Sequence, residues 1–305
     1  MSAPSTYTRA LTELQAAKLR TILTEKGFKF VEKPYCLFSA EGPKVNVAVY
    51  EKGPKIVAQG KGIADFITFI LEPEVLGVAE LGYEEVTQPD MFTPHLGIDE
   101  SGKGDFLGPL VIAGAYVDAS MARKLRDMGV MDSKRIGSDA RIEAIAAEMR
   151  HARVVHDVIV IGPEKYNELY SKFGNLNRLL AWGHARVIEN LLERVPDCPR
   201  ALSDQFANPK VLQAALLTKG KTIELQQRTK AESDPAVAAA SIFAREKFVR
   251  WLKESGDRLG IILPKGASPM VKQAGAALIR KHGPDILPTV AKMHFKTAAE
   301  VTAIA

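Results

Sequence analysis

Residues 96–109 read Leu96-Gly-Ile-Asp-Glu-Ser-Gly-Lys-Gly-Asp-Phe-Leu-Gly-Pro109, and the apolar run Leu110–Val117 follows directly. Asp99 and Glu100 end a short apolar segment, and a glycine loop with one lysine comes next. Carboxylates at the end of a strand commonly hold a divalent metal ion, and a loop of small residues lets backbone N–H groups approach a sugar-phosphate chain. An acidic pair can also be a solvated turn, but the flanking glycines and apolar strands favour metal-assisted cleavage of a phosphodiester.

Two better-known phosphate-binding patterns fail on spacing. Gly102-x-Gly104-x-x-x-Gly108 has one residue too many for the dinucleotide fingerprint, and a strand pattern follows where that fingerprint needs a helix. Gly220-Lys221-Thr222 resembles the end of a Walker loop, but the position that requires the first glycine holds Ala215. Neither a dinucleotide-binding nor a nucleoside-triphosphate-binding function is expected.

The composition is that of a globular protein with enough residues for two domains. The chain has 305 residues, of which 46% are hydrophobic and 25% charged. We expect neither a signal peptide nor a membrane span, and two widely spaced cysteines without metal-ligand spacing indicate free thiols in the cytoplasm. The net charge of +5 favours a polyanionic partner, although many basic proteins bind no nucleic acid.

The first unit, residues 1–85, is predicted to be a small α+β domain. Apolar residues at helical spacing indicate a helix from Leu11 to about Ile22, and Gly27 is a plausible stop. Strands are expected at residues 35–39, 45–50 and 55–59, and a second helix at residues 64–71.

Four lysines of this unit are expected to be exposed: Lys44, Lys52, Lys55 and Lys61. On the solvent face of a sheet they could contact a phosphate backbone, because each neutralised phosphate releases counterions. They could equally keep a small sheet soluble and protect its edges. The sequence leaves both interpretations open.

Residues 86–94 show no periodicity and are interpreted as a linker to a second unit, residues 95–305. Strand and helix patterns alternate in this unit, which predicts an α/β domain with a mixed sheet and helices on both faces. The expected strands are residues 96–99, 110–117, 153–161, a short strand ending at 204, and 222–228. Helices are expected at residues 120–128 and 138–150, more than one helix within residues 163–194, a long helix at 235–254, and further helical segments to the end.

Catalysis with two metal ions needs three or four converging carboxylates, and two more candidates stand at suggestive places. Asp204 ends a short apolar segment, and Glu232 precedes a helix rich in alanine, which could pack closely on a sheet. Asp204 could instead cap a turn, and Glu232 and Asp234 could both favour a helix N-terminus. Because Asp234 stands directly before Pro235, we assign the helix cap to Asp234 and the metal to Glu232.

Other polar and aromatic residues carry weaker signals. Lys134, in Asp132-Ser133-Lys134, could meet a phosphate, although the residues alone favour an ordinary loop. His294 could donate a proton during product release, but a packed or surface histidine is the favoured interpretation. Trp182 and Trp251 lie in apolar helical stripes and are expected in the core.

These motifs together resemble the ribonuclease HIII family, a bacterial branch of the type 2 ribonucleases H. The resemblance rests on Gly97-Ile-Asp-Glu-Ser-Gly-Lys-Gly-Asp-Phe-Leu-Gly-Pro109 and continues in order through the second unit. The further matching segments are Met131-Asp-Ser-Lys134, Asp204, Thr229-Lys-Ala-Glu-Ser233 with Ala238-Ala-Ala-Ser-Ile242, Leu263-Pro-Lys-Gly-Ala267 and Ala291-Lys-Met-His-Phe295. In the first unit, Tyr50-Glu-Lys-Gly-Pro-Lys55 fits the N-terminal domain of that family.

The resemblance implies a ribonuclease H-like fold preceded by a domain similar to the TATA-binding protein fold. It implies an endonuclease that hydrolyses the RNA strand of RNA/DNA hybrids and leaves 5′-phosphate and 3′-hydroxyl ends. Two divalent ions, Mg²⁺ or Mn²⁺, are expected. The residues that match the metal-binding and catalytic positions of the family are Asp99, Glu100, Asp204 and Glu232.

The resemblance also implies which residues bind the hybrid. Ser101, Gly102, Lys103 and Gly104 are expected to grip the RNA strand near its 2′-hydroxyls, with Lys134 on a phosphate. The first unit would bind the backbone of the hybrid, and the protein would act as a monomer. A hybrid-binding protein without catalysis and a DNA nuclease on the same sheet are the alternatives. The four acids argue against the first, and the loop expected to sense the 2′-hydroxyl argues against the second.

Overall fold

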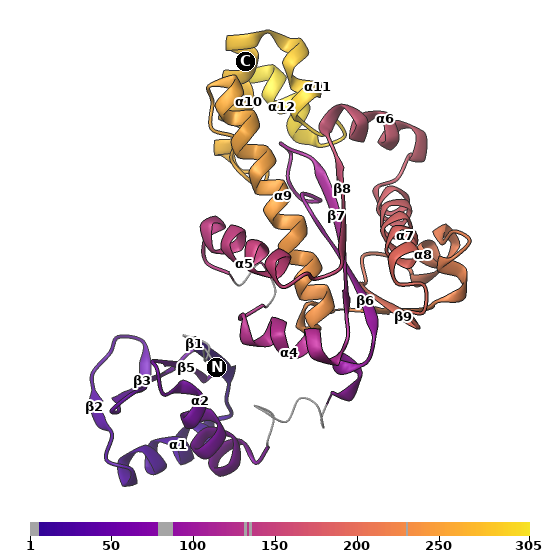
Figure 1. Ribbon diagram of the computed structural model, residues 1–305. Coiled ribbons are helices and arrows are strands. Elements are labelled where there is room, and N and C mark those ends of the chain that lie inside the picture. Colours follow the sequence, from indigo (N-terminus) through magenta and orange to yellow (C-terminus); the bar gives the residue numbers. More distant parts are fainter. Residues whose placement is uncertain (1–5, 79–87, 131–132, 134–135, 230) are drawn as a thin grey trace. The chain divides into compact units, whose positions relative to one another are not determined.

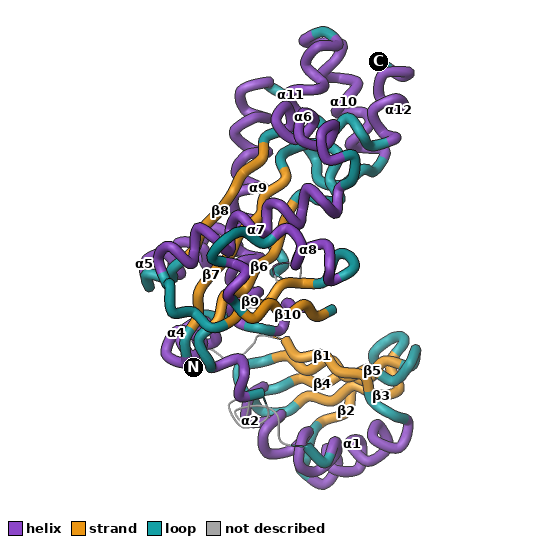
Figure 2. Tube along the Cα trace, turned by 90° about the vertical axis from the view of Figure 1, so that its right-hand side faces the viewer, coloured by secondary structure: helices purple, strands orange, loops and turns teal. Residues whose placement is uncertain are grey.

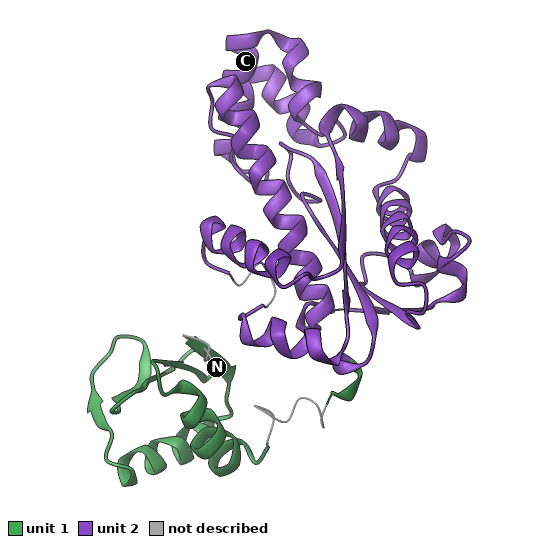
Figure 3. Cartoon of the chain, viewed as in Figure 1, with its two compact units in different colours: residues 1–90 green, residues 91–305 purple. Residues whose placement is uncertain are grey.

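The computed structural model describes residues 6–78, 88–130, 133, 136–229 and 231–305. The chain forms two compact units, residues 1–90 and residues 91–305, which are coloured separately in Figure 3. Each unit has its own five-stranded sheet and is described by itself. In the described part of the chain, no helix combines the length and the apolar character needed to cross a membrane.

The sheet of the first unit is antiparallel throughout, with the strand order β1-β5-β4-β3-β2. Its strands are β1 (Thr6–Ala10), β2 (Lys29–Val31), β3 (Cys36–Glu41), β4 (Asn46–Tyr50) and β5 (Lys55–Gln59). The helices are α1 (Glu13–Glu25), α2 (Ile63–Phe66) and the π-helix η1 (Ile67–Leu76). Figure 2 shows the strands as one layer with α1 beneath it.

In the part of this unit that the structure describes, the helices pack on one face of the sheet. Val47 and Val49 of β4 and Ile56 of β5 are buried in one cluster with Leu19 of α1 and Ile67 of η1. Because side chains alternate along a strand, the intervening residues point to the other face. That face, which we call the open face, carries polar residues from three strands: Thr6, Thr8, Asn46, Tyr50, Lys55 and Gln59.

Two edge strands of this unit were not predicted. β1 alternates threonine with tyrosine and arginine, and β2 has three residues, so neither has an apolar run. The predicted strand at residues 35–39 begins instead at Cys36, because Tyr35 has a φ of 63° and belongs to a turn. The predicted second helix is present as α2 and η1. Lys44, Lys52, Lys55 and Lys61 are exposed as expected, but only Lys55 lies on a strand.

The sheet of the second unit is mixed, as predicted, with the order β10-β9-β6-β7-β8. β10 and β6 pair in parallel with β9, whereas β7 pairs antiparallel with both β6 and β8. The strands are β6 (His95–Ser101), β7 (Leu110–Val117), β8 (His156–Ile161), β9 (Arg200–Asp204) and β10 (Glu224–Arg228).

Helices cover both faces of this sheet (Figure 1). One face packs against α4 (Ala119–Asp127), α5 (Asp139–His151) and the long α9 (Pro235–Leu259). The other face packs against α6 (Pro163–Phe173) and α7 (Leu176–Arg194), with α8 (Pro209–Ala215) beside α7. The chain ends in α10 (Pro269–His282), α11 (Leu287–Val290) and α12 (Lys296–Ile304), and short 3₁₀ turns lie at Pro89–Phe92, Gly220–Thr222, Ala231–Ser233 and Pro284–Ile286.

The first turns of α9 lie against β6 at very short range. Ala236, Ala239 and Ala240 are fully buried, so little side-chain bulk separates the helix from the sheet. A Cβ atom added at Gly97 of β6 would lie 2.1 Å from the Ala236 carbonyl carbon, so this strand position requires glycine. The predicted close packing of the alanine-rich helix on the sheet is confirmed. Because the helix starts beside β6, the residues just before it lie near the end of β9.

Most helices and strands of the second unit begin and end within one or two residues of the predicted positions, and the larger differences are these. β8 begins at His156 rather than at residue 153, because Arg153 has a φ of 61° and ends the turn after α5. Part of the predicted linker lies outside the described residues, and the rest contains the 3₁₀ turn Pro89–Phe92. α9 continues to Leu259, five residues beyond the predicted 254, and ends at Gly260 in the left-handed conformation.

Candidate active site

Three of the predicted carboxylates lie at the ends of two neighbouring strands. Asp99 and Glu100 are near the end of β6, and Asp204 is the last residue of β9. These strands run parallel, and their register pairs Ile98 with Ser203, which brings the next residues, Asp99 and Asp204, to the same edge. All three acids line one cavity of about 390 Å³.

The carboxylate of Glu100 is held by two cationic or polar partners. His184 Nε2 lies 3.1 Å from Oε2, and Lys103 Nζ lies 3.3 Å from Oε1. Burial by itself raises the pKa of this carboxyl, but His184 and Lys103 outweigh burial and keep the pKa below its usual value. The side chain of Glu100 is therefore oriented and negatively charged at neutral pH. Asp99 is fixed by a local bond, because its Oδ1 accepts the Glu100 N–H at 2.8 Å.

His184, which the sequence analysis did not select, links both strands of the site. It is fully buried on α7, and its Nδ1 lies 3.0 Å from Ser203 Oγ. The Ser203 hydroxyl donates in turn to the Asp204 carbonyl at 3.0 Å. One histidine thus connects the Glu100 carboxylate of β6 to the end of β9, where Asp204 stands. Apolar residues of α7 surround it, so no local sequence pattern marks this role.

Glu232 and Asp234 have different environments. Glu232 is half-buried in the 3₁₀ turn Ala231–Ser233, and the Ala231 N–H donates to Asp204 Oδ1 at 3.3 Å. Asp234 is 3% exposed, caps α9 through the Ala236 and Val237 N–H groups, and contacts His95 Nε2 at 2.9 Å. The predicted helix cap at Asp234 is confirmed, and its carboxylate is engaged in structural bonds.

Glu232 does not line the cavity that holds the other three acids. Among the residues that the structure describes, no three histidine, cysteine or acidic side chains are gathered into a formed metal site. The donors nevertheless fit Mg²⁺ or Mn²⁺, since Asp99, Glu100, Asp204 and the neighbouring Glu232 offer carboxylate oxygens only. The Ala231 N–H bonds Asp204 Oδ1, so the backbone places Glu232, the next residue, near Asp204.

The glycine loop forms one wall of the cavity. Ser101, Gly102, Lys103 and Gly104 all line it, as predicted for a loop that faces the carboxylates. Gly102 has a φ of 86°, and an added Cβ atom would lie 2.2 Å from the Pro109 carbonyl oxygen, so only glycine fits. Lys103 lies over the Phe206 ring, with its Nζ 5.5 Å from the ring centroid. Of the predicted residues, Lys134 and Asp132 lie outside the described part of the chain.

The cavity also has a basic and hydroxyl-bearing wall that sequence reasoning missed. Arg245 of α9 and Lys265 line it together with Ser133 and Ser241. Arg245 Nη1 donates to the Ser133 carbonyl, and the hydroxyls of Ser133 and Ser241 lie 2.7 Å apart. Arg245 follows Ser241 by one helical turn, a spacing that places both on one face of the helix. Cationic and carboxylate groups thus face the same space, an arrangement suited to a phosphodiester beside metal ions.

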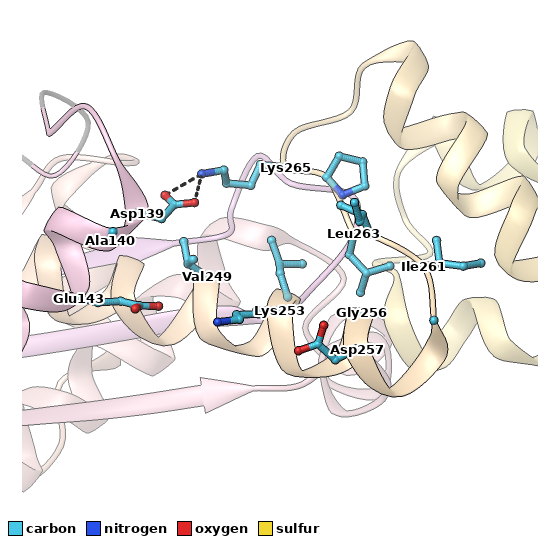
Figure 4. Close-up of a pocket in the computed structure, with 14 residues that line it drawn as sticks. Asp139, Ala140, Glu143, Val249, Lys253, Gly256, Asp257, Ile261, Leu263 and Lys265 are labelled. Atoms are coloured by element: carbon cyan, nitrogen blue, oxygen red, sulfur yellow. Dashed lines mark hydrogen bonds and ion pairs between the residues drawn. The ribbon is translucent and has the colours of Figure 1, made fainter.

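A larger hollow of about 770 Å³ lies beside this cavity, between α5, α9 and residues 260–265 (Figure 4). Asp139 forms an ion pair with Lys265 there, at 2.8 Å from Nζ to Oδ1. Burial raises the pKa of Asp139, but Lys265 and Arg245 outweigh burial and lower it. The lining contains the acids Asp139, Glu143 and Asp257 and the lysines Lys253 and Lys265, and none of the predicted site residues.

The remaining predicted residues are packed. His294 stacks on Tyr170 at 4.2 Å between ring centroids, and its Nδ1 lies 3.4 Å from the Tyr166 hydroxyl. Burial and the nearby Lys292 lower the pKa of His294. His294 is therefore packed against aromatic rings, which is one of the two interpretations favoured from the sequence. Trp182 and Trp251 pack against the two clusters on either side of the sheet, as expected.

Comparison with known proteins agrees with this geometry. The family model described as Ribonuclease HII matches residues 96–298. The curated Ribonuclease HIII of Protochlamydia amoebophila is 45% identical over 92% of each chain, and that of Chlamydia trachomatis serovar L2 is 42% identical over 98%. The chain belongs to the ribonuclease HIII family. The resemblance stated from the motifs is thereby confirmed.

Solved ribonuclease HIII structures match the whole chain. Bst-RNase HIII in complex with Mn²⁺ has a TM-score of 0.68 at 28% identity, with 99% of each chain covered. RNase H3 of Aquifex aeolicus has a TM-score of 0.55 at 30% identity. The ribonuclease H2 of Pyrococcus horikoshii shares the fold at 23% identity, but 98% of that chain covers only 69% of this one. Ribonuclease HIII chains thus match along both units, whereas the HII family model begins at residue 96.

Proposed function

We propose that this chain is an endonuclease that hydrolyses the RNA strand of RNA/DNA hybrids and leaves 5′-phosphate and 3′-hydroxyl ends. The observation that carries the proposal is the cavity in which Asp99, Glu100 and Asp204 face the glycine loop. Membership of the ribonuclease HIII family supports it. The reported complex of Bst-RNase HIII with Mn²⁺ supports a divalent metal requirement.

Asp99, Glu100, Asp204 and Glu232 would hold two divalent ions, either Mg²⁺ or Mn²⁺. When bound, two such ions lower the pKa of an attacking water and stabilise the leaving 3′-oxygen. Asp99 stands between Glu100 in its own strand and Asp204 in the next, so its carboxylate would be a central member of the donor set. His184 orients Glu100 for this task through its bond at 3.1 Å.

The walls of the cavity would position the RNA strand. The loop of residues 101–104 offers backbone groups at close range, which suits contact with the 2′-hydroxyl that distinguishes RNA from DNA. Lys103, Arg245 and Lys265 supply positive charge to neighbouring phosphates. Lys134 remains a predicted phosphate contact.

Residues 1–85 would form a substrate-binding domain that is joined by residues 86–94 to a catalytic domain, residues 95–305. The polar open face of its sheet supports this role, because one antiparallel face without a helix cover is available to a duplex. Its similarity to the TATA-binding protein fold is part of this proposal. All four acids come from one chain, which supports action as a monomer, and the free cysteines agree with a cytoplasmic location.

Cleavage of three end-labelled duplexes by the purified protein tests the function: RNA/DNA, DNA with one ribonucleotide, and all-DNA. Each duplex is incubated with Mg²⁺, with Mn²⁺ and with a chelator. Metal-dependent cutting of the RNA/DNA hybrid alone is the expected result. Cutting of all-DNA would indicate a DNA nuclease, and hybrid binding without any cutting would indicate a binding protein.

A further inference from the structure

Lys292 is a buried cation that the proposed chemistry does not use. It is 0% exposed in the segment between α11 and α12. Its ammonium donates to the carbonyl oxygens of Asp105 at 2.9 Å and Gly108 at 2.7 Å, and lies 5.6 Å from the centroid of the Tyr166 ring. Its hydrogen-bond partners are therefore backbone carbonyls, which are neutral groups.

Those two carbonyls belong to the segment that joins the glycine loop to β7. The backbone of this segment pairs with the chain around Lys292: the Gly108 N–H donates to Val290 and the Lys292 N–H donates to Phe106. The same segment is also bonded to Gly266. The Phe106 N–H donates to the Gly266 carbonyl, and Asp105 Oδ1 accepts the Gly266 N–H at 2.6 Å. Residues 105–108 are thus held between two distant parts of the chain.

Burying this ammonium is unfavourable, so its retention needs a reason. Burial lowers the pKa of Lys292 to about 7, although the nearby Asp105 acts in the opposite direction. An apolar side chain of similar length would fill the same space without the loss of hydration. An apolar side chain cannot donate hydrogen bonds. Only a donor such as the Lys292 ammonium can bond the carbonyls of Asp105 and Gly108 at the same time.

We propose that Lys292 is a positioning residue for hybrid binding. By fixing the Asp105 and Gly108 carbonyls, it holds residues 101–104 in the conformation that receives the RNA strand. A loop that is already ordered loses less conformational entropy when it binds. Lys292 contacts none of the four proposed metal ligands, so it acts on the substrate through the loop and leaves metal binding unchanged. This inference rests on the proposed function of the loop.

The chain supplies a control that makes the same two-carbonyl contact from an exposed lysine. Lys281 of α10 also donates to two successive carbonyls, those of Leu259 at 2.9 Å and Gly260 at 3.2 Å. These carbonyls end α9, and neither residue belongs to the glycine loop or to the segment that follows it. Lys281→Met removes the same kind of contact as Lys292→Met without touching that segment.

The experiment measures the dissociation constant of an RNA/DNA hybrid with Mg²⁺ present, in an Asp99→Asn background that prevents cleavage. Lys292→Met is expected to raise this constant about tenfold, and Lys281→Met less than about twofold. With Asp99 restored, Lys292→Met should raise KM by a similar factor while kcat changes less than about threefold. Mn²⁺ affinity, measured by electron paramagnetic resonance, should not change.

A folded Lys292→Met protein that binds the hybrid as tightly as its parent would overturn the inference. An equal loss of affinity in Lys281→Met would also overturn it, because the effect would then be general. If Lys292→Met does not fold, Lys292→Gln decides, since its neutral amide still donates to one carbonyl. A weakened hybrid affinity in that variant supports the proposal, and parental affinity overturns it. If the parent itself fails to bind the hybrid, the proposed function fails first and this inference fails with it.

Discussion

The two sheets of this protein have the same number of strands but expose polar groups in different ways. The sheet of the first unit has helices on one face, so polar residues are spread over the other. The sheet of the second unit is covered on both faces, and its carboxylates stand where β6 and β9 end. An open face offers many weak contacts to a long ligand, whereas a covered sheet concentrates chemistry at one edge. The comparison predicts that changes in the two regions will affect different kinetic constants.

Asp99→Asn should have the largest effect, because it removes a charged donor at the edge of the covered sheet. The amide oxygen can still accept the Glu100 N–H, so the melting temperature should change by less than about 2 °C. We expect kcat for hybrid cleavage to fall by about 10³-fold or more, because the amide lacks the negative charge that a ligand of divalent ions would supply. Steady-state cleavage of a labelled hybrid and a thermal melt measure both quantities.

Asp118→Asn is the matched control for this prediction. Asp118 caps α4 through the Met121 N–H, and asparagine serves equally well as a cap. Its kcat should equal that of the unchanged protein. Normal turnover in a folded Asp99→Asn protein would exclude the proposed metal role of Asp99.

Removal of residues 1–85 should have the next largest effect, and it should change KM rather than kcat. The core of the first unit is separate from the clusters of the second, so the remaining chain retains its own core. We expect KM for the hybrid to rise by about ten- to a hundredfold, with a much smaller change in kcat, since phosphate contacts supply much of the affinity. Titration of hybrid against a fixed amount of enzyme measures both constants. An unchanged KM would show that the open face does not bind substrate.

His184→Ala tests whether a histidine of α7, a helix that covers the sheet, affects metal binding by the carboxylates. Loss of the bonds from His184 to Glu100 and Ser203 should weaken Mn²⁺ binding about tenfold, as found for groups that orient metal ligands. His184→Gln keeps a donor toward Glu100 and should recover part of the affinity. His156→Ala is the control, because His156 stacks on Phe243 and bonds the Val154 carbonyl instead. Equal Mn²⁺ affinity in all three variants would show that His184 does not contribute to metal binding.

These residues also show which parts of the site were predictable from sequence. Asp99, Glu100 and Asp204 each end a short apolar strand, and the fold brings them into one cavity because β6 and β9 are parallel neighbours. His184 and Arg245 were missed because both lie within helices, where their neighbours give only an amphipathic pattern. Their roles come from packing across the chain, which no local pattern reports.

Edges and turns of the fold were missed for a similar reason. β1 was not predicted because it has no apolar run, and it is held by pairing with β5, which is distant in sequence. Tyr35 and Arg153 were each assigned to the start of a strand, but both adopt positive φ values that only the surrounding turn imposes. Propensity describes a residue in isolation, whereas β1 depends on a distant strand and the two positive φ values depend on the turns in which they lie.

The buried Lys292 predicts a pH dependence of stability. Its pKa of about 7 in the folded protein lies below the roughly 10.4 of an unfolded chain, so between these values the unfolded state binds more protons. The free energy of unfolding should therefore gain a contribution that rises from about pH 7 to pH 10 and is level below pH 7. Asp105, Tyr166 and His294 are the titratable groups that face this ammonium.

Thermal melts at pH 7 and pH 9.5 measure this contribution as the difference between the unchanged protein and Lys292→Met. The difference should shift by several degrees in favour of the unchanged protein at the higher pH. Lys281→Met, which loses two similar carbonyl bonds, controls for the bonds themselves. A pH-independent difference for Lys292→Met would mean that the lysine stays charged throughout.

Lys55→Gln should give the smallest effect and separates the two faces of the first unit. Lys55 lies on the open face, whereas Lys18 is an equally exposed lysine on α1, the helix that covers the other face. If the open face contacts the phosphates of the hybrid, Lys55→Gln should weaken binding about two- to threefold. It should also lower the slope of log affinity against log salt by about 1, because one counterion release is lost. Lys18→Gln should change neither value. Equal salt slopes for both variants would mean that Lys55 does not contact the hybrid and that the lysines only keep the small sheet soluble. Any binding by the open face would then depend on its uncharged polar residues.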